Sequence, residues 1–489
     1  MWSLLLSALL LAVPQETSAP SAPNLVVLMA DDLGWGDPGC YDTGSRVATP
    51  HMDRLAREGL RFTDAHSPSA VCTPTRYGLL TGRYAWRTRL KKGVLNGRSA
   101  NLIAVERRTI AELLRDAGYR TAVVGKWHLG LGPEGESTDY ARPVHPSPTD
   151  HGFDDSLVIP ASLDMEPYLW LLGDRPVQEA TARTEKSGHR RQGGGGFWRA
   201  GGIAPDFRFE EVLPRTASRA EELIERYARE EPERPFFLYL PLSAPHTPWV
   251  PTRAFIGRTE IGHYGDFVAE VDDVVGRVLD ALDRTGQAGE TIVVVTSDNG
   301  SHWPVSDIER HGHDANGGWR GQKADVHEGG HRVPFLVRGP GIEAGGVREA
   351  VICLTDLYAT AAAITGQELG EDEGEDSFDL SPLLFDDTTR GLDGASFARE
   401  DCVHHSLNGT FALRSGRWKW IEGRGSGGFT APRKVEPAEG EPHGQLYDLV
   451  ADPAESENLC LERPQVVEDL QARLDALRGA GRSRGVSKE

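Results

Sequence analysis

Three features are scarce in this sequence of 489 residues: positive charge, cysteine and long apolar segments. There are 53 Lys and Arg residues against 73 Asp and Glu residues, so the formal net charge at pH 7 is −20. A general nucleic-acid binder needs a dominant basic surface, and nucleic acid is therefore not an expected partner. Any anionic substrate must be bound by a local cluster of positive side chains rather than by the field of the whole chain.

Long apolar segments are missing except at the very start of the chain. The apolar stretch in residues 1–13 is too short for a membrane helix, which needs about 20 residues. Pro14 and a run of small and polar residues follow, a pattern typical of a secretory signal peptide cleaved between Ala12 and Ala19. We therefore expect residues 1–19 to be a signal peptide and the mature protein to be secreted or periplasmic, or lysosomal in an animal, without a membrane span. No Lys or Arg precedes the stretch, which leaves open a simple apolar N-terminus.

Cysteine is rare, and its count is odd. The five cysteines are Cys40, Cys72, Cys353, Cys402 and Cys460. In an oxidising compartment an odd count leaves one cysteine without a disulfide partner, and the presence of this cysteine needs a chemical explanation. If Cys72 is the unpaired residue, Cys402 and Cys460 could form a disulfide bond within the C-terminal region.

Apolar, β-branched runs alternate with segments of helical periodicity over most of the chain. The strand-like runs are 24–29, 121–124, 235–240, 291–295 and 333–337, and the helical segments are 51–58, 109–117, 219–229 and 266–283. This alternation predicts an α/β fold, a large, mostly parallel sheet sandwiched by helices. In such sheets ligands bind beyond the carboxyl ends of the strands.

The pattern changes near residue 396 to short strands and a closing helix. It predicts a smaller C-terminal α+β domain at 396–489, after an α/β domain at 20–385. The segment 300–318 is dense in His, Gly and Asp and is expected to be a loop. The acidic run 370–376 is expected to be a solvated surface segment.

Polar residues directly follow two of the predicted strands. Asp31 and Asp32 come after the first strand, and Asp298 and Asn299 follow the strand at 291–295. Adjacent carboxylates repel each other unless a cation lies between them, although aspartate at a strand end is also common in turns and caps. If both strand ends meet at one edge of the sheet, their oxygen ligands suit Ca²⁺ or Mg²⁺ better than zinc.

The segment C-T-P-T-R at residues 72–76 combines a cysteine with a helix start. Pro74 suits the first turn of a helix, so Cys72 would lie at the helix N-terminus, where backbone N–H groups favour an anion. Arg76 lies four residues further on and projects from the same face. Taken alone, Cys72 could also be a small buried apolar residue or the thiolate nucleophile of a metal-independent hydrolase.

C-T-P-T-R, with L-L-T-G-R at 79–83, resembles the signature of the formylglycine-dependent sulfatases of the alkaline phosphatase superfamily. Further segments resemble the family pattern in order: G-K-W-H at 125–128, P-H-T-P at 245–248, S-D-N-G at 297–300, and G-Q-K at 321–323 leading into E-G-G-H-R-V-P at 328–334. The likeness covers residues 24–460 and makes residues 20–385 the expected sulfatase catalytic domain.

The resemblance implies that a separate formylglycine-generating enzyme oxidises Cys72 to formylglycine on the nascent chain. One hydroxyl group of the hydrated aldehyde would attack sulfur, and the other would collapse to the aldehyde and eject sulfate. Asp31, Asp32, Asp298 and Asn299 would bind Ca²⁺, with Mg²⁺ possible, together with an oxygen of the modified Cys72.

The resemblance also assigns five further catalytic residues. Arg76 would fix and polarise the diol, and Lys126 and Lys323 would neutralise charge on the transferred sulfuryl oxygens. His246, with or without Lys323, would protonate the leaving oxygen, and His128 would act as the base on the second hydroxyl group. A single histidine is more often structural than catalytic, and the matching motifs reverse that expectation here.

Sulfated carbohydrates are the expected substrates, more so than sulfated small molecules, on family analogy alone. Several His and Trp residues lie between the second polar strand end and Lys323. They could line the substrate pocket, or they could form a polar loop without substrate contacts: His302, Trp303, His311, His313 and Trp319.

Two other functions stay open at this point. Phosphonate monoester and phosphodiester hydrolases of the same superfamily use a similar metal site, although G-K-W-H and E-G-G-H-R-V-P favour a sulfatase. A non-catalytic binder of sulfated glycans would have no need for the intact set of Arg76, Lys126, His128, His246 and Lys323.

Overall fold

A computed structural model describes residues 22–187, 197–385, 397 and 399–485. The expected signal peptide at 1–19 lies outside the described residues, as do residues 386–396 at the expected domain boundary. The domain limits 20–385 and 396–489 therefore stay predictions. Among the described residues, no helix is both long enough and apolar enough to cross a membrane.

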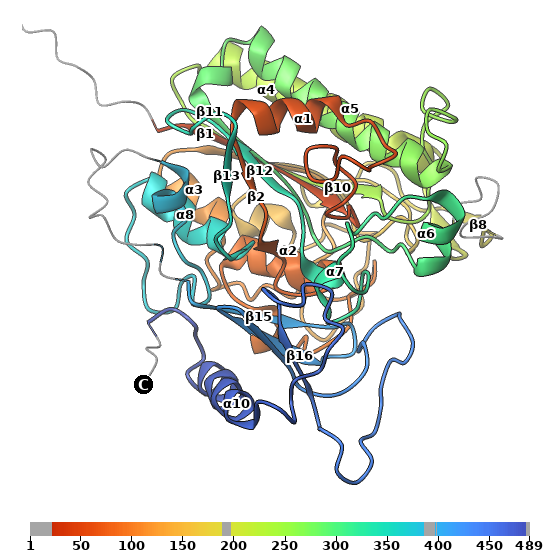
Figure 1. The fold of residues 1–489 in the computed structure, drawn as a ribbon. Coiled ribbons are helices and arrows are strands. Elements are labelled where there is room, and N and C mark those ends of the chain that lie inside the picture. Colours follow the sequence, from red (N-terminus) through yellow and green to blue (C-terminus); the bar gives the residue numbers. More distant parts are fainter. Residues whose placement is uncertain (1–21, 188–196, 386–396, 398, 486–489) are drawn as a thin grey trace, which may run out of the picture.

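The centre of the fold is a ten-stranded sheet (Figure 1). Its middle strands run parallel in the order β11 (Thr291–Ser297), β1 (Asn24–Asp31), β10 (Phe236–Pro245) and β4 (Arg120–Lys126). These are four of the five runs predicted from the sequence, and β1, β10 and β11 are buried along their whole length. The mostly parallel α/β sheet is confirmed.

The fifth predicted run, β12 (Phe335–Arg338), pairs antiparallel with β11. The chain leaves β11 at the carboxyl edge of the sheet and re-enters it from that edge, so β12 must run the opposite way. The long excursion between the two strands, residues 298–334, therefore stays next to the strand ends that bind ligands in α/β folds.

Helices cover both faces of the sheet (Figure 1). On one face, α4 (Val212–Glu230) and α5 (His263–Arg284) pack on β10, with α1 (Pro50–Glu58) beside α5. On the other face lie α2 (Cys72–Thr81), α3 (Ile110–Asp116) and α8 (Asp356–Ile364). Helix α4 begins seven residues before the predicted 219, because Pro214 falls in its first turn, where no N–H donor is required.

The remaining elements of this part are short. They are β2 (Leu60–Phe62), β3 (Ala65–His66), β5 (Asp155–Ile159), β6 (Leu171–Leu172), β7 (Arg175–Pro176), β8 (Ala182–Thr184), β9 (Gly201–Ile203), α6 (Val305–His311), α7 (Glu328–His331), β13 (Gly346–Arg348), β14 (Ile352–Cys353) and α9 (Ser381–Leu384). Four single 3-10 turns lie at Ala85–Arg87, Pro148–His151, Phe209–Glu211 and Ala288–Glu290. Helix α6 lies inside the segment 300–318, so the expectation of a plain loop there was wrong.

The acidic run 370–376 also departs from expectation. Glu375 and Asp376 are buried rather than solvated. Glu375 forms ion pairs with Arg83 and Arg107, and Asp376 pairs with Arg87 at 2.8 Å. The end of the run is therefore a structural anchor, because buried carboxylates are retained only where cations or hydrogen-bond donors meet them.

The C-terminal part is a four-stranded antiparallel sheet with one helix, below the large sheet in Figure 1. Its strands follow one another in order: β15 (Asp401–His405), β16 (Phe411–Ser415), β17 (Trp418–Ile421) and β18 (Gln445–Asp448). Helix α10 (Pro464–Gly479) packs against β16 and β17. The predicted small α+β unit is confirmed.

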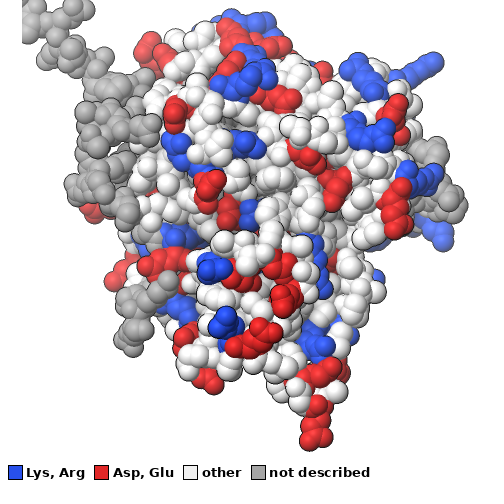
Figure 2. Space-filling view, in the orientation of Figure 1, with Lys and Arg blue, Asp and Glu red and all other residues white. Residues whose placement is uncertain are grey.

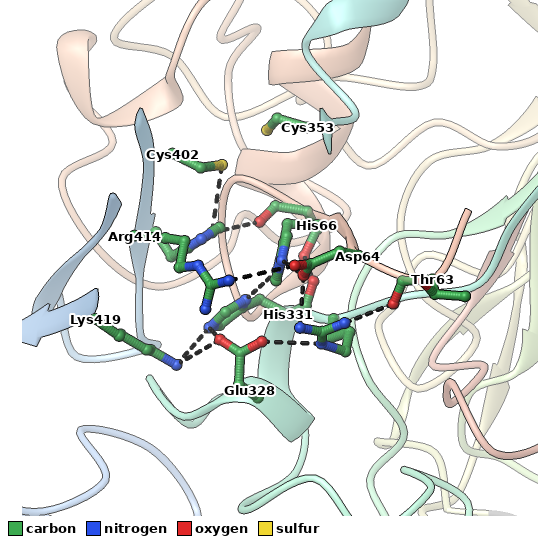
Figure 3. A network of polar contacts seen from close by, with 12 residues as sticks. Thr63, Asp64, His66, Glu328, His331, Cys353, Cys402, Arg414 and Lys419 are labelled. Atoms are coloured by element: carbon green, nitrogen blue, oxygen red, sulfur yellow. Dashed lines mark hydrogen bonds and ion pairs between the residues drawn. The ribbon is translucent and has the colours of Figure 1, made fainter. Parts of the chain in front are cut away.

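A buried polar network joins this sheet to the large domain (Figure 3). Lys419 on β17 lies 3.0 Å from a carboxylate oxygen of Glu328 and donates to Nε2 of His331 at 3.0 Å. The proton of the His331 ring is therefore on Nδ1, which donates to Nδ1 of His66 at 3.0 Å. The Nε2–H of His66 then donates to Asp64 at 2.7 Å. A single tautomer of each ring satisfies the whole chain of hydrogen bonds.

The histidines of this network form a stack of neutral rings. Nitrogens of His66, His331 and His404 lie within 4.8 Å of one another, close enough to suggest a metal site. However, the rings of His331 and His404 stack at 3.9 Å with an interplanar angle of 10°, which does not direct their lone pairs at one point. Burial lowers the pKa of both rings, and the nearby Lys419 charge lowers it further. These contacts favour packing over metal binding.

Acidic and basic side chains are interspersed on the surface. Figure 2 shows Lys and Arg residues beside Asp and Glu residues over the face drawn there, without a large area of one sign. The cations that could attract an anionic substrate are instead the buried ones at the carboxyl edge of the sheet.

Candidate active site

The sheet brings the predicted site residues together at the carboxyl ends of its central strands. In the registers of β1 with its neighbours, Ala30 pairs with Ser297 and Asp31 pairs with Pro245, so the polar residues after each strand share one edge. All ten predicted residues are buried: Asp31, Asp32, Cys72, Arg76, Lys126, His128, His246, Asp298, Asn299 and Lys323.

Two lysines each pair with one of the adjacent aspartates. The Nζ atom of Lys126 lies 2.6 Å from Asp31, and that of Lys323 lies 2.7 Å from Asp32. Burial alone would raise the pKa of Asp31, but the charge of Lys126 and of other nearby cations outweighs it and holds the pKa well below its ordinary value. The Asp32 charge, against the opposing effect of burial, raises the pKa of Lys323, which stays protonated.

Arg76 links the two strand ends. Its Nη2 and Nε atoms donate to one oxygen of Asp298 at 2.7 and 3.1 Å, and its Nη1 donates to the carbonyl of Lys126 at 2.9 Å. Burial, followed by repulsion from Asp31, still raises the pKa of Asp298 to about 7, although Arg76 opposes the rise. One guanidinium does not offset the carboxylates gathered here, and a further cation would relieve their repulsion.

Two buried oxygens of the site have no hydrogen-bond partner. Oδ1 of Asp31 and Oδ1 of Asn299 are buried and accept no hydrogen bond. Ligand atoms of Asp31, Cys72 and Asp298 lie within 4.8 Å of one another, as do those of Asp31, Asp32 and His246. Oxygen-rich donors of this kind suit a hard divalent cation, so the residues fit Ca²⁺ or Mg²⁺.

Cys72 is the first residue of α2 and is only 2% exposed. Burial raises the pKa of its thiol despite the helix N-terminus and the charges of Lys126 and Lys323. The unmodified side chain is therefore a protonated thiol, which argues against a thiolate nucleophile and a metal-independent cysteine hydrolase.

Each of the two histidines of the site is held by a hydrogen bond from a ring nitrogen to a backbone carbonyl. The Nε2–H of His128 donates to the carbonyl of Leu95 at 2.7 Å, which leaves Nδ1 as a buried lone pair without a partner. Burial, followed by the Lys126 and Arg76 charges, lowers the pKa of His128 well below its ordinary value. His246 donates through Nδ1 to the carbonyl of Thr247, and its Nε2 lies 3.8 Å from Asp32.

The comparisons with known proteins agree with this geometry. The family model described as Sulfatase matches residues 23–367. The chain is 36% identical to N-acetylgalactosamine-6-O-sulfatase of Bacteroides thetaiotaomicron, covering 93% of both chains. It is 34% identical to human arylsulfatase A, covering 96% of this chain and 91% of that protein. A solved structure from the glycosaminoglycan metabolism of B. thetaiotaomicron matches with a TM-score of 0.82 and 34% identity, covering 94% of this chain and all of that one.

The chain belongs to the sulfatase family. It is therefore a sulfuric ester hydrolase, and the resemblance noted in its motifs is confirmed at the level of the family.

In this sulfatase, most of the aromatic residues considered for the substrate pocket have packing roles. Trp303 is buried, stacks on Tyr264 at 4.5 Å and donates to the carbonyl of His313 at 2.8 Å. The His313 ring in turn lies 2.9 Å from Asp37. Trp319 packs under the guanidinium of Arg332 at 3.9 Å, and His311 lies 5.5 Å from Trp303.

His302 contacts an aromatic residue from the C-terminal part of the chain. Its half-buried ring lies 4.8 Å from Phe429, from the loop between β17 and β18. This loop is fixed by Asp325, which accepts from the backbone N–H of Phe429 at 2.8 Å. Lys323, two residues from Asp325, donates its backbone N–H to Ser301, next to His302. No local motif marks Phe429, so its position beside the site could not be read from the sequence.

The cysteine pairing suggested by the sequence was wrong. All five cysteines are free thiols in the structure, and Cys402 faces Cys353 rather than Cys460 (Figure 3). Sequence order favoured a pair within the C-terminal region, whereas β15 packs against β14 of the large domain.

Proposed function

We propose that this sulfatase hydrolyses the sulfate esters of sulfated carbohydrates with a formylglycine made from Cys72 and a bound Ca²⁺, Mg²⁺ being the other candidate. The observation that carries the proposal is the position of Cys72, buried at a helix start with its sulfur within 4.8 Å of oxygens of Asp31 and Asp298. A thiol with a raised pKa has no use as a nucleophile there, whereas an oxygen on the same carbon would complete an oxygen-rich cation site.

The modified residue and the cation each supply one kind of chemistry. The hydrated aldehyde supplies two hydroxyl groups on one carbon, one to attack sulfur and one whose deprotonation releases sulfate. A divalent cation held by Asp31, Asp32, Asp298 and Asn299 would supply Lewis acidity beside residue 72.

Three cations of the chain would act in the reaction, Arg76 on the diol of residue 72 and Lys126 and Lys323 on the sulfuryl oxygens. Arg76 is held by Asp298 and by the carbonyl of Lys126, so its guanidinium is fixed one helical turn from residue 72. Lys126 and Lys323 are fixed by their aspartate partners, and Lys323 stays charged. Preorganised positive charge of this kind stabilises the negative charge that develops on the sulfuryl oxygens.

The histidines would move the protons. His128 is neutral and has a free lone pair on Nδ1, which suits a base acting on a hydroxyl group of residue 72. His246 in its doubly protonated form, with or without the Lys323 ammonium, would protonate the leaving alcohol oxygen, since both groups flank Asp32.

The relatives support a carbohydrate substrate, since one of them is an N-acetylgalactosamine-6-O-sulfatase and a similar structure comes from glycosaminoglycan metabolism. The His302–Phe429 pair beside the site offers an aromatic surface for a sugar ring. Maturation would require a formylglycine-generating enzyme acting on the nascent chain and export to the periplasm or the cell exterior, or to the lysosome in an animal.

The test combines mass analysis with parallel assays. The peptide that contains residue 72 should differ from the cysteine peptide by replacement of CH₂SH with CHO, and sulfate should be released from 6-sulfated N-acetylgalactosamine or from an aryl sulfate. Turnover should stop with EDTA and with Cys72→Ala.

An active preparation that carries the thiol would refute the mechanism, and faster turnover of an aryl phosphonate than of an aryl sulfate would favour the phosphonate hydrolase alternative. Glycan binding without any turnover would favour the non-catalytic binder.

A further inference from the structure

Two cysteines outside the active site face each other across the contact between the two parts of the molecule. Cys353 belongs to β14 in the large domain, and Cys402 belongs to β15 in the C-terminal sheet. Both are fully buried and pack in the same apolar cluster, which also contains Tyr84 and Leu413. Figure 3 shows the two side chains pointing toward one another above the histidine stack.

The strand registers explain why the two residues meet. Cys353 pairs with His66 in the parallel contact of β14 with β3, and the His66 ring lies 5.0 Å from the ring of His404. Cys402 lies two residues before His404, so both side chains project from the same face of β15. The Sγ atom of Cys402 lies 4.0 Å from Nδ1 of His404, and the Cys402 thiol lies close enough to Cys353 to influence the pKa of the Cys353 thiol.

The backbone on both sides of the pair is held in place by one buried arginine. Arg399 donates from Nε to Asp356 at 2.9 Å and from Nη1 to the carbonyl of Asp401 at 2.9 Å. The same carboxylate of Asp356 accepts from the backbone N–H of Cys353 at 2.8 Å. Arg399 thus connects the residue next to Cys402 with the carboxylate bound to Cys353. The separation of the two thiols is therefore fixed by contacts that do not involve sulfur.

We propose that Cys353 and Cys402 form a disulfide bond that ties the C-terminal sheet to the large domain when the chain folds in an oxidising compartment. The proposal rests on export of the chain but not on the sulfatase mechanism. It assigns a role to two of the four cysteines outside the active site and leaves Cys72 free for its own modification.

The oxidation requires a disulfide donor such as oxidised glutathione. The Cys353 thiolate attacks one sulfur of the donor, forms a mixed disulfide and releases the first thiolate. The Cys402 thiol then loses its proton and attacks Sγ of Cys353, which expels the second thiolate. Two protein thiols are oxidised and one donor disulfide is reduced to two thiols. Because both cysteines are buried in the folded chain, the first step precedes docking of the C-terminal sheet.

Once the C-terminal sheet has docked, burial and the neighbouring groups shift the pKa values of the two thiols in opposite directions. Burial would raise the pKa of Cys353, but the hydrogen bond from Cys402 and the charge of Arg399 outweigh it and lower the pKa. Burial raises the pKa of Cys402 well above its ordinary value. In the same folded state, burial raises the pKa of Cys40 to about 12 and that of Cys460 to about 11.

The first experiment maps the disulfide in the full-length wild-type chain. The chain is refolded with oxidised and reduced glutathione, trapped with N-ethylmaleimide in denaturant and digested with trypsin. We expect residues 349–390 and 400–414 to appear as one cross-linked species that separates on reduction. Recovery of both peptides with alkylated cysteines, or a cross-link between Cys402 and Cys460, would overturn the proposal.

The second experiment measures the effect of the bond on stability. The cross-link would close a loop between residues 353 and 402, which predicts a thermal midpoint roughly 5 °C higher in the oxidised chain than in the chain folded under reducing conditions. Cys353→Ser should abolish this difference, and the matched control Cys460→Ser should keep it. If Cys353→Ser does not fold, Cys402→Ala should abolish the difference in its place. The midpoints of oxidised and reduced wild type then remain the direct comparison. An equal midpoint for oxidised and reduced wild type would refute a bond that joins the two parts.

Discussion

Removal of the Arg76 guanidinium should make the stability of the protein strongly dependent on calcium. Arg76 is fully buried, and it is the only side chain that hydrogen-bonds to Oδ2 of Asp298 among the described residues. In Arg76→Met the volume is roughly kept, but Asp298 and Asp31 lose a cation in a buried site. Breaking a buried pair in this way costs about 3–5 kcal/mol of the free energy of unfolding when no metal is bound.

Calcium should reverse much of this loss. A ligand present at 100 times its dissociation constant stabilises the folded state by about 2.7 kcal/mol. In the variant the carboxylates no longer face a guanidinium that repels the ion, so the gain from calcium should exceed that of the wild type by roughly 1–4 kcal/mol. Sulfatase turnover should nevertheless fall by about 10²–10³-fold, because the stabilising charge is lost from the reacting groups.

The assay is urea unfolding at pH 7 in EDTA and in excess CaCl₂, with Arg87→Met as the matched control. Arg87 is a half-buried arginine whose side chain is only 3% exposed and donates twice to Asp376 at 2.8 Å, away from the site. Both variants should lose similar stability in EDTA, and only Arg76→Met should recover with calcium. Equal recovery in the control, or no calcium effect on wild type and variants alike, would refute a cation site at the strand ends.

Three further substitutions test the nucleophile, the aromatic surface beside the site and a buried carboxyl group. Cys72→Ala should abolish sulfate release while it changes the unfolding midpoint in urea little, because a small buried side chain replaces another. Phe429→Ala should raise KM for a sulfated sugar several-fold and leave the turnover of an aryl sulfate nearly unchanged, which steady-state kinetics on both substrates would show. Burial raises the pKa of Glu270 to about 7, above its ordinary value, so its contribution to stability is fully present below about pH 4.5 and is lost as the pH rises to about 7. Glu270→Gln should therefore be more stable than wild type by roughly 3 kcal/mol at pH 8 and equal to it at pH 4, measured by urea unfolding.

The sequence predicted the catalytic edge of the sheet well because each site residue lies in a short local pattern. Asp31 and Asp298 directly follow buried strands, and the parallel register of those strands brings them together. Cys72 and Arg76 lie one turn apart on a helix whose start was marked by Pro74. Such positions follow from periodicity and strand order, without knowledge of distant contacts.

Contacts between distant segments could not be predicted in this way. Phe429 reaches His302 only because Asp325 fixes its loop, and Cys402 meets Cys353 only because β15 packs on the ribbon of β3 and β14. Neither pair leaves a periodic or compositional signal. The acidic run 370–376 was misleading in the same way. Its many charges predicted a solvated surface segment, whereas its last two residues are buried against arginines from another segment.

The charges of the site explain how a chain with a net charge of −20 can bind an anionic ester. With all three carboxylates ionised, Asp31, Asp32 and Asp298 would balance the three cations Arg76, Lys126 and Lys323, and this inner set would carry no net charge. The proposed divalent ion would leave this set with two positive charges. A sulfate monoester carries one negative charge, and a deprotonated hydroxyl group on residue 72 carries another, so together they would restore neutrality. Productive binding would therefore require the ion, the ester and the nucleophile at once, and a dianionic phosphate ester would bring one negative charge too many.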